Sequence, residues 1–152
     1  MNELWIRNRQ RRHPVSLGRL REVTRHLLEK ELRLESYQLG IQLVGRRTMA
    51  EVNEHYLGHE GATDVITFDH AGPGLPLYGE LFICPAVAAR QGADYRTGTT
   101  AELVRYVVHG VLHLRGHDDT SPAPRRRMKR QENRLMRRLR DVFPLSDSMG
   151  RG

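Results

Sequence analysis

Cysteine is nearly absent from this 152-residue chain, which contains Cys84 alone. A single thiol cannot form an internal disulfide, so the cysteine content gives no indication of an oxidising compartment. Cys84 ends an apolar segment and has no second cysteine to accompany it, which favours a small buried side chain over a ligand or nucleophile. We therefore expect a protein of the reducing cytoplasm.

Long apolar runs are missing as well. No segment approaches the ~20 consecutive apolar residues that a membrane helix requires. The first residues, MNELWIRNRQRRHP, contain no apolar stretch of the kind found in signal peptides. Neither secretion nor a membrane-spanning helix is expected.

Negative charge is in the minority. The chain has 25 Lys and Arg residues against 18 Asp and Glu residues, and its formal net charge is +7. Nine of the basic residues lie between positions 125 and 140. Clustered cations attract polyanions, so a nucleic acid is the favoured class of partner. A solvated helix face would produce the same pattern and stays open as an alternative.

The length fits one ordinary domain with a real core, which we place at residues 1–143, followed by a disordered tail at 144–152. Alternating or β-branched segments predict strands, and apolar residues at helical spacing predict helices. The strands are expected at 4–6, 39–43, 64–68 and 78–83, with the last two as a hairpin, and the helices at 17–28, 49–56, 85–95, 102–116 and from 125 onward. This order predicts an α+β fold in which a small mixed sheet packs against helices.

Particular residues should define the ends and the buried faces of these helices. Thr48 with Glu51, and Thr99 with Glu102, have the spacing of capping boxes. The helix over 102–116 is apolar over more than half of its circumference, which predicts that it is buried. The inward stripe of the last helix is expected to consist of Met128, Leu135, Leu139 and Val142.

Two histidines on the buried helix are the first candidates for chemistry. His109 and His113 are four residues apart, so they lie on one face and about 6 Å apart along the helix axis. A buried helix has little reason to carry two imidazoles among valines unless their nitrogens are satisfied, and one metal ion satisfies both. An isolated pair of this kind is more often structural.

The residues that follow strengthen the interpretation of a metal site. In HGVLHLRGHDD, Gly116 can end the helix and turn the chain back toward the two histidines. Zinc hydrolases with this layout have their third ligand ten positions after the first, which here is Asp119, while His117 is the alternative. We expect one Zn²⁺ per chain, although a carboxylate ligand also suits other divalent ions. Three protein ligands would leave an open catalytic position, whereas four would form a closed structural site.

The residue after His109 bears on the type of reaction. Metalloproteases of the HExxH type have their general base there as glutamate, whereas this chain has Gly110. A peptidase is therefore the less favoured hydrolase. The excess of arginine favours a phosphodiester substrate, because cations stabilise the charge that develops on phosphate during cleavage.

HGVLHLRGHDD resembles HGxLHLxGYDH, the signature of the YbeY family of bacterial metal-dependent endoribonucleases. Further upstream, Asn53 and Tyr56 resemble the N-xx-Y motif of the family, and the segments 63–68 (TDVITF) and 79–85 (GELFICP) resemble two of its other segments. The resemblance covers roughly residues 37–120.

The resemblance implies a small α+β fold, a zinc ion, a cytoplasmic location and a single-strand-specific endoribonuclease. Its implied task is 3′ maturation of small-subunit (16S) ribosomal RNA and ribosome quality control, with ribosomal RNA and the small subunit as partners. The metal ligands of the family fall on His109, His113 and Asp119, and its tyrosine falls on His117. A non-enzymatic ribosome-assembly factor with a structural metal, or a zinc metallopeptidase, would be the alternative.

The chain departs from the family pattern at Leu57, where the family often has a basic residue after the aromatic of N-xx-Y. Arg115 is our candidate for the missing catalytic cation, with Arg46 and Arg47 as alternatives. The basic helix should follow the RNA backbone. The expected RNA-binding residues are Arg125, Arg126, Arg127, Lys129 and Arg130.

Overall fold

The computed structural model describes residues 2–57, 64–72 and 74–145, so most of the expected tail at 144–152 lies outside the described residues. In chain order, the elements are β1 (Asn2–Asn8), α1 (Leu17–His26) with the π-helical turn η1 (Leu27–Glu31), β2 (Tyr37–Leu43), α2 (Arg46–Leu57), β3 (Val65–Asp69), β4 (Leu77–Ile83), α3 (Pro85–Asp94), α4 (Thr99–Leu114) and α5 (Pro122–Val142). No helix in these ranges combines the length and the apolar character that crossing a bilayer demands. The expected α+β class is confirmed.

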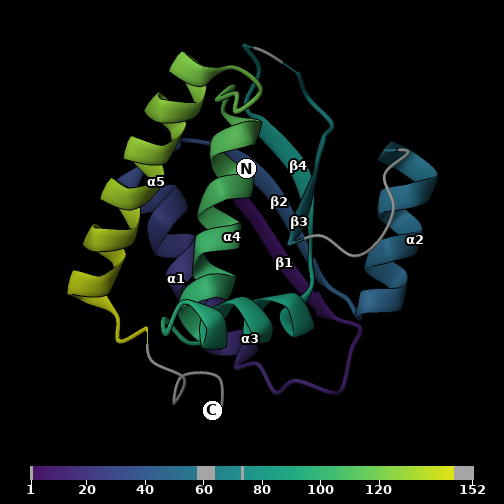
Figure 1. The fold of residues 1–152 in the computed structure, drawn as a ribbon. Helices are drawn as coiled ribbons and strands as arrows, with labels where there is room; N and C mark the ends of the chain where they lie inside the picture. The colour runs from purple at the N-terminus through teal and green to yellow at the C-terminus, as the bar shows by residue number, and fades with distance from the viewer. Residues whose placement is uncertain (1, 58–63, 73, 146–152) are drawn as a thin grey trace.

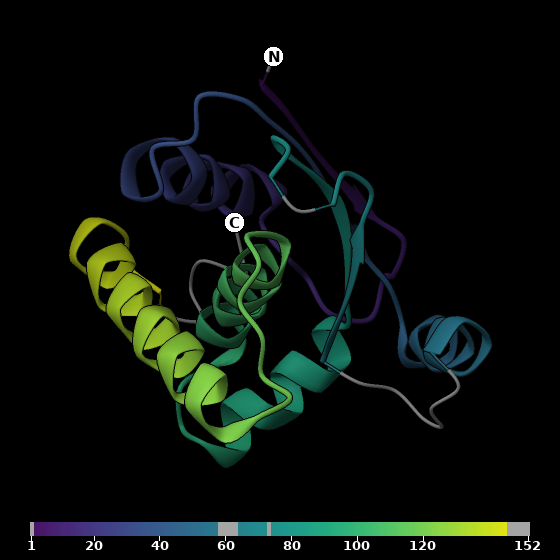
Figure 2. The same cartoon turned by 90° about the horizontal axis from the view of Figure 1, so that it is seen from above.

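The four strands form one mixed sheet in the order β1-β2-β4-β3. Strands β1, β2 and β4 are parallel, and β3 pairs antiparallel with β4, which confirms the predicted hairpin. Helix α4 crosses one face of the sheet, flanked by α1, α3 and α5, while α2 stands on the other side (Figures 1 and 2). The main core therefore lies between the sheet and the layer that contains α4.

Alternation along the central strands determines which face of the sheet is buried. On β2, Leu39, Ile41 and Leu43 are fully buried, while the intervening Gln42 is only half-buried. Gln42 faces the opposite side, where its amide donates to a carboxylate oxygen of Glu80 on β4 at 3.0 Å. One face of the sheet is thus apolar and covered by helices, as the period-2 pattern predicts.

Two glycines allow α4 to lie close to β4. A Cβ atom at Gly110 of α4 would come within 2.6 Å of a methyl carbon of Leu81 on β4. In the reverse direction, a Cβ atom at Gly79 of β4 would come within 2.5 Å of a methyl carbon of Leu114 on α4. Each element thus inserts a leucine where the other has no side chain. These contacts fix the height and rotation of the helix that carries the two histidines.

The end of α4 follows the prediction, whereas its start does not. Gly116 has φ +96°, and its N–H donates to the His113 carbonyl while the N–H of His117 donates to the Leu112 carbonyl, which is a Schellman motif. At the start, Gly98 is the N-cap, and Glu102 accepts from the hydroxyl of Thr97 at 2.9 Å. The capping box predicted for Thr99 and Glu102 is therefore wrong.

The capping box predicted for Thr48 and Glu51 is also wrong. Helix α2 begins at Arg46, and the N–H of Met49 already donates to the carbonyl of Gly45 at 3.0 Å. Thr48 therefore lies inside the first turn and cannot cap it. A backbone bond formed one turn earlier has taken the place of the side-chain cap.

Helix α5 is longer than predicted, beginning at Pro122, and its buried stripe differs at one end. Met128, Leu135 and Leu139 are buried as expected, but Val142 is 52% exposed, so its assignment to the stripe was wrong. The chain leaves the helix at Phe143, and Phe143 and Leu145 are the residues that cover the core at this point. The core thus includes Leu145, beyond the expected domain end at 143.

We predict that Gly110→Ala destabilises the protein by about 1–3 kcal/mol, because Leu81 is fully buried and has no free space to move into. Gly18→Ala is the matched control, since it makes the same change in a helix, and no atom lies within 4 Å of its new Cβ. That variant should be neutral or more stable by up to about 1 kcal/mol. Urea unfolding measures both; equal stability of the two variants would contradict the close packing of α4.

Candidate metal centre

Helix α4 presents His109 and His113 on its half-covered face. Their side chains are 30% and 27% exposed, so solvent reaches both rings although the helix itself is buried. The two Nε2 atoms face each other at 3.1 Å. The predicted alignment of the two rings toward one point is therefore present in the structure.

Asp119 joins the two histidines through the turn at Gly116. Its Oδ2 atom lies 3.6 Å from Nε2 of His109 and 3.4 Å from Nε2 of His113. Among the described residues, these three form the group of His, Cys, Asp and Glu side chains that could hold a metal ion. His117, the alternative third ligand, contributes its main-chain carbonyl instead, which faces Nδ1 of His113 at 3.1 Å.

Hydrogen bonds on the far side of each ring determine which nitrogen is free to bind a metal. Nδ1 of His109 lies 2.8 Å from Oε1 of Glu132, and Nδ1 of His113 faces the His117 carbonyl, so each Nδ1 carries the proton and donates it. Both Nε2 atoms are then acceptors. When both rings are neutral, two acceptors at 3.1 Å and a carboxylate oxygen nearby cannot hydrogen bond to one another, whereas a cation between them interacts favourably with all three.

The spacing of the three atoms suits a small divalent ion. In a tetrahedral site with ligands at about 2.0–2.1 Å, the ligand atoms lie about 3.3 Å apart. The three distances here are 3.1, 3.4 and 3.6 Å. The donor set of two imidazoles and one carboxylate is also that of several catalytic zinc sites, which keep a fourth position open. The described residues therefore fit a metal centre without rearrangement.

Glu132 of α5 is the carboxylate that orients His109, and the sequence interpretation missed it. Its side chain is 5% exposed, and besides His109 it binds Arg105 at 2.6 Å and Lys129 at 3.3 Å. One signal was available in the sequence: Glu132 is one of two acidic residues in a strongly basic helix, and it stands at an inward position four residues after Met128. Carboxylates that hold a metal-binding histidine are a general feature of such sites.

The charges around Glu132 keep it ionised. Burial by itself raises the pKa of this carboxyl, but hydrogen bonds from His109 and Arg105 and the charge of Lys129 lower it to about 2. In return, although burial disfavours a charged imidazole, the hydrogen bond and charge of Glu132 raise the pKa of His109 above its ordinary value. Glu132 thus makes His109 a more basic ligand and also one that binds protons more readily.

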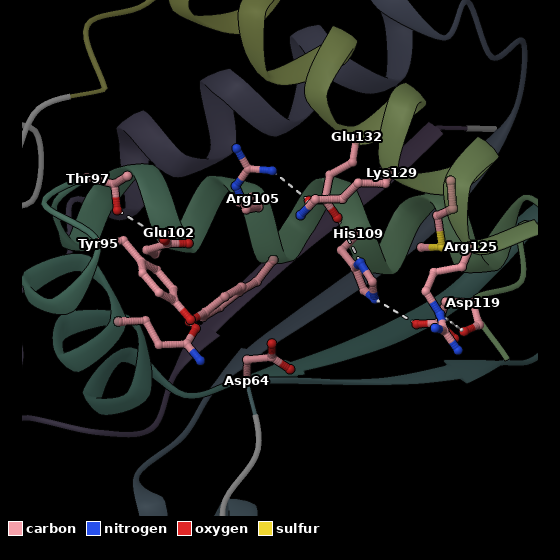
Figure 3. A pocket seen from close by; sticks show the side chains of 13 residues that line it. Asp64, Tyr95, Thr97, Glu102, Arg105, His109, Asp119, Arg125, Lys129 and Glu132 are labelled. Atoms are coloured by element: carbon pink, nitrogen blue, oxygen red, sulfur yellow. Dashed lines mark hydrogen bonds and ion pairs between the residues drawn. The ribbon is translucent and has the colours of Figure 1, made fainter. Parts of the chain in front are cut away.

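A cleft of about 500 Å³ opens beside the metal-binding atoms (Figure 3). His109 and Asp119 lie at one end, and Tyr95, Thr97 and Glu102 at the other. The walls come from the end of α3, one face of α4, the first turns of α5 and Asp64 before β3. The volume is in the range of small-molecule sites and can take part of a polymer.

The structure separates the predicted cations into two groups. Arg125 and Lys129 line the cleft, and the described lining contains none of the other predicted RNA-binding residues, Arg126, Arg127 and Arg130. Arg115, the candidate catalytic residue, lies on a different hollow with Arg33 and Asp69. Arg46 and Arg47 are on α2, across the sheet from α4.

Leu57, where a basic residue was missing, ends α2 and is likewise on the far side of the sheet from α4. The described lining of the cleft contains no residue of α2. The cations nearest to the metal-binding atoms come instead from the start of α5.

We predict that Glu132→Gln weakens Zn²⁺ binding by about 10–100-fold, because the amide cannot supply the charge that orients and polarises His109. Isothermal titration of the metal-stripped protein measures this change. Glu22→Gln is a matched control: Glu22 forms an exposed ion pair with Arg19, and its loss should leave zinc affinity unchanged. Similar losses in both variants would refute a specific role of Glu132.

We also predict that zinc affinity falls as the pH falls, because His109 must lose its proton to bind a metal and Glu132 raises the pKa at which it does so. Below that pKa, affinity should drop about tenfold per pH unit for each proton displaced. In Glu132→Gln the pKa of His109 falls, so the decline should begin at lower pH. Competition with a zinc indicator between about pH 8 and 5.5 tests this; an unchanged midpoint in the variant would count against it.

Known proteins share both the sequence and the fold. The family model described as endoribonuclease YbeY matches residues 5–140. An endoribonuclease YbeY from Nocardioides sp. is 35% identical over 133 residues, covering 82% of this chain and 89% of the relative. Another, from Salinibacter ruber, is 33% identical over 147 residues, covering 90% and 91%.

The solution structure of TM1509 from Thermotoga maritima is similar with a TM-score of 0.62 over 95% of both chains, at 22% identity, and this likeness supports the fold alone. The match to the family model, in contrast, includes every element from β1 to α5 and all three candidate metal ligands. The resemblance seen in the sequence is confirmed, and the chain belongs to the endoribonuclease YbeY family.

Proposed function

We propose that the protein, an endoribonuclease by family, is a cytoplasmic enzyme that binds one Zn²⁺ per chain through His109, His113 and Asp119 and cleaves single-stranded RNA. We further propose that its substrate is the 3′ region of small-subunit (16S) ribosomal RNA, in rRNA maturation and ribosome quality control. Ribosomal RNA and the small subunit would be its partners. The net charge of +7 supports a polyanionic substrate.

The observation that carries the proposal is the convergence of three possible ligand atoms, from His109, His113 and Asp119, at the end of an open cleft. When bound there, a divalent ion supplies Lewis-acid stabilisation of the charge that develops on phosphoryl oxygens. The protein contributes the position: α4 aims both Nε2 atoms, the turn at Gly116 brings in Asp119, and Glu132 holds the ring of His109. The cleft admits the RNA strand to this point.

A peptidase is disfavoured by the direction in which a side chain at position 110 would point. A side chain there would meet Leu81 of β4, so it would enter the sheet and not the cleft. A glutamate after His109 could not act on a substrate at the metal-binding atoms. The general base of HExxH peptidases therefore has no place in this helix.

A purely structural ion is disfavoured by the number of ligands. The described residues provide three donor side chains, and Asp118, the carboxylate next to Asp119 in the chain, instead accepts hydrogen bonds from the N–H and hydroxyl of Thr120. A closed structural zinc site has four protein ligands. Three ligands beside a cleft favour a centre that meets its substrate.

We predict that His113→Ala and Asp119→Asn each lose bound zinc and RNA cleavage together, because the first removes one of three donors and the second replaces an anionic donor with a weaker neutral amide oxygen. Asp118→Asn is the matched control, since it makes the same chemical change one residue away at an exposed side chain that faces Thr120. It should keep about one zinc per chain and the parent rate. Elemental analysis and cleavage of a labelled single-stranded RNA measure both properties.

Tight zinc binding with cleavage that is absent, or indifferent to zinc removal, would instead identify an RNA-binding assembly factor with a structural ion. The ribosomal part of the proposal has a separate test. In cells depleted of the protein, 16S precursor with an unprocessed 3′ end should accumulate, and the gene for Asp118→Asn should correct this while that for Asp119→Asn should not. Normal 16S ends in depleted cells would contradict this part.

A further inference from the structure

In the first turns of α5, two of the predicted RNA-binding side chains line the cleft, and the other three do not. Arg125 and Lys129 are one turn apart, and both line the cleft (Figure 3). An α-helix has about 3.6 residues per turn, so each residue is rotated by about 100° from the one before it. Around α5, the directions about 100–200° from Arg125 are therefore those of Arg126, Arg127 and Arg130. Charge is thus dense along the whole helix, but only these two cations of the predicted set reach the space beside the metal-binding atoms.

Arg125 is fixed at the metal end of the cleft. Its Nε–H donates to the main-chain oxygen of Asp119 at 3.0 Å, which ties the guanidinium to the residue that carries the third donor atom. A guanidinium has five N–H donors, and this bond uses one of them. The terminal nitrogens can therefore form the paired hydrogen bonds to a phosphate for which arginine is suited.

Lys129 lies one turn further along the same wall. Its Nζ atom is 3.3 Å from Oε2 of Glu132, an oxygen that Arg105 also binds at 2.6 Å. Arg105 and Lys129 thus bind the buried carboxylate of this wall, and together with Arg125 the three cations outnumber it, which leaves the wall positive. The Lys129 side chain is 63% exposed, so its ammonium is accessible to a ligand in the cleft.

Asp64 lies across the cleft from α5, and Glu102, which accepts from the hydroxyl of Thr97, lies at the end away from the metal-binding atoms (Figure 3). Carboxylates repel phosphates, whereas the α5 side of the cleft carries cations. An RNA backbone in the cleft should therefore lie along the α5 side. Arg125 and Lys129 are about 6 Å apart along the helix axis, a span comparable to that between successive phosphates of one strand. Neither side chain is aromatic, so contacts here would read the backbone and not the base sequence.

We propose that Arg125 and Lys129 bind two successive phosphates of a single-stranded RNA, with Arg125 on the phosphate beside the metal-binding atoms and Lys129 on the next one toward Tyr95. This assignment rests on the proposed function. Arg125 is then the cation that was sought in place of Leu57, and it comes from the start of α5 instead of from Arg115.

The test compares Arg125→Gln and Lys129→Gln with Arg126→Gln and Arg130→Gln, which remove the same charge from neighbouring positions of the same helix. The probe is a short 2′-O-methylated single-stranded RNA, whose dissociation constant is measured with the zinc-loaded protein over a range of salt concentrations. Losing a phosphate contact should reduce the slope of log Kd against log salt by about 0.7 for a single strand. We expect this reduction in the first two variants and the parent slope in the other two.

Arg125→Lys and zinc analysis exclude an indirect effect through Asp119. Arg125→Lys keeps the charge and should restore the slope, and all variants should retain zinc. Equal slope changes in all four glutamine variants would mean diffuse attraction to α5 and would overturn the assignment, as would no change in any variant or a parent that does not bind the probe.

Cleavage assays separate this inference from the proposed function. If Asp119→Asn abolishes cleavage but Arg125→Gln cleaves and binds like the parent, the nuclease proposal stands and the phosphate assignment fails. If the parent cleaves no RNA but the slopes differ as expected, the nuclease proposal fails while the phosphate site stands. In the expected result, Arg125→Gln lowers kcat/KM by at least tenfold with zinc retained.

Discussion

The close packing of α4 on β4 is the constraint on which the rest of the site depends. Gly110 leaves room for Leu81 and Gly79 leaves room for Leu114, so the helix can approach the sheet in one rotation only. That rotation buries the valine-rich face and leaves the histidine face at the edge of the core. If α4 were packed less tightly, the side chains of the two histidines would have no fixed orientation. Asp119 and α5 would then not be positioned to contact them.

Helix α5 completes the centre from outside the motif. Its buried carboxylate, Glu132, would be unstable alone in the interior, but three basic groups from two helices surround it. The same contacts hold α5 against α4 and determine the proton position on His109. One ionised residue therefore joins the packing of two helices to the protonation of His109, a candidate metal ligand.

The two helices divide the chemistry of the cleft between them. Helix α4 and the turn after it supply the candidate metal ligands, while α5 supplies the carboxylate that binds His109 and two cations that line the cleft. Both groups of residues meet at Asp119, because its side chain faces the histidines and its main-chain oxygen accepts from Arg125. The proposed metal and phosphate positions are therefore linked through one residue. This arrangement suits a reaction at a phosphate.

The sequence by itself determined the features that depend on local rules. Helical periodicity places His109 and His113 one turn apart on the same face. The left-handed conformation of Gly116 turns the chain, and Asp119 follows within a few residues. The hairpin of β3 and β4 follows in the same way from the alternation of apolar and polar residues. Only the tertiary structure decided that Glu132 orients His109. It also decided that the cleft is lined by Arg125 and Lys129 and not by Arg115. Likewise, only the structure showed that Thr48 and Thr99 do not cap their helices. The contact of His109 with Glu132 spans 23 residues and depends on how two helices cross. The helix starts depend on hydrogen bonds of Gly45 and Thr97, which precede the residues where the sequence predicted each helix to begin. No periodicity within a single segment contains that information, because it arises from the packing of one element against another.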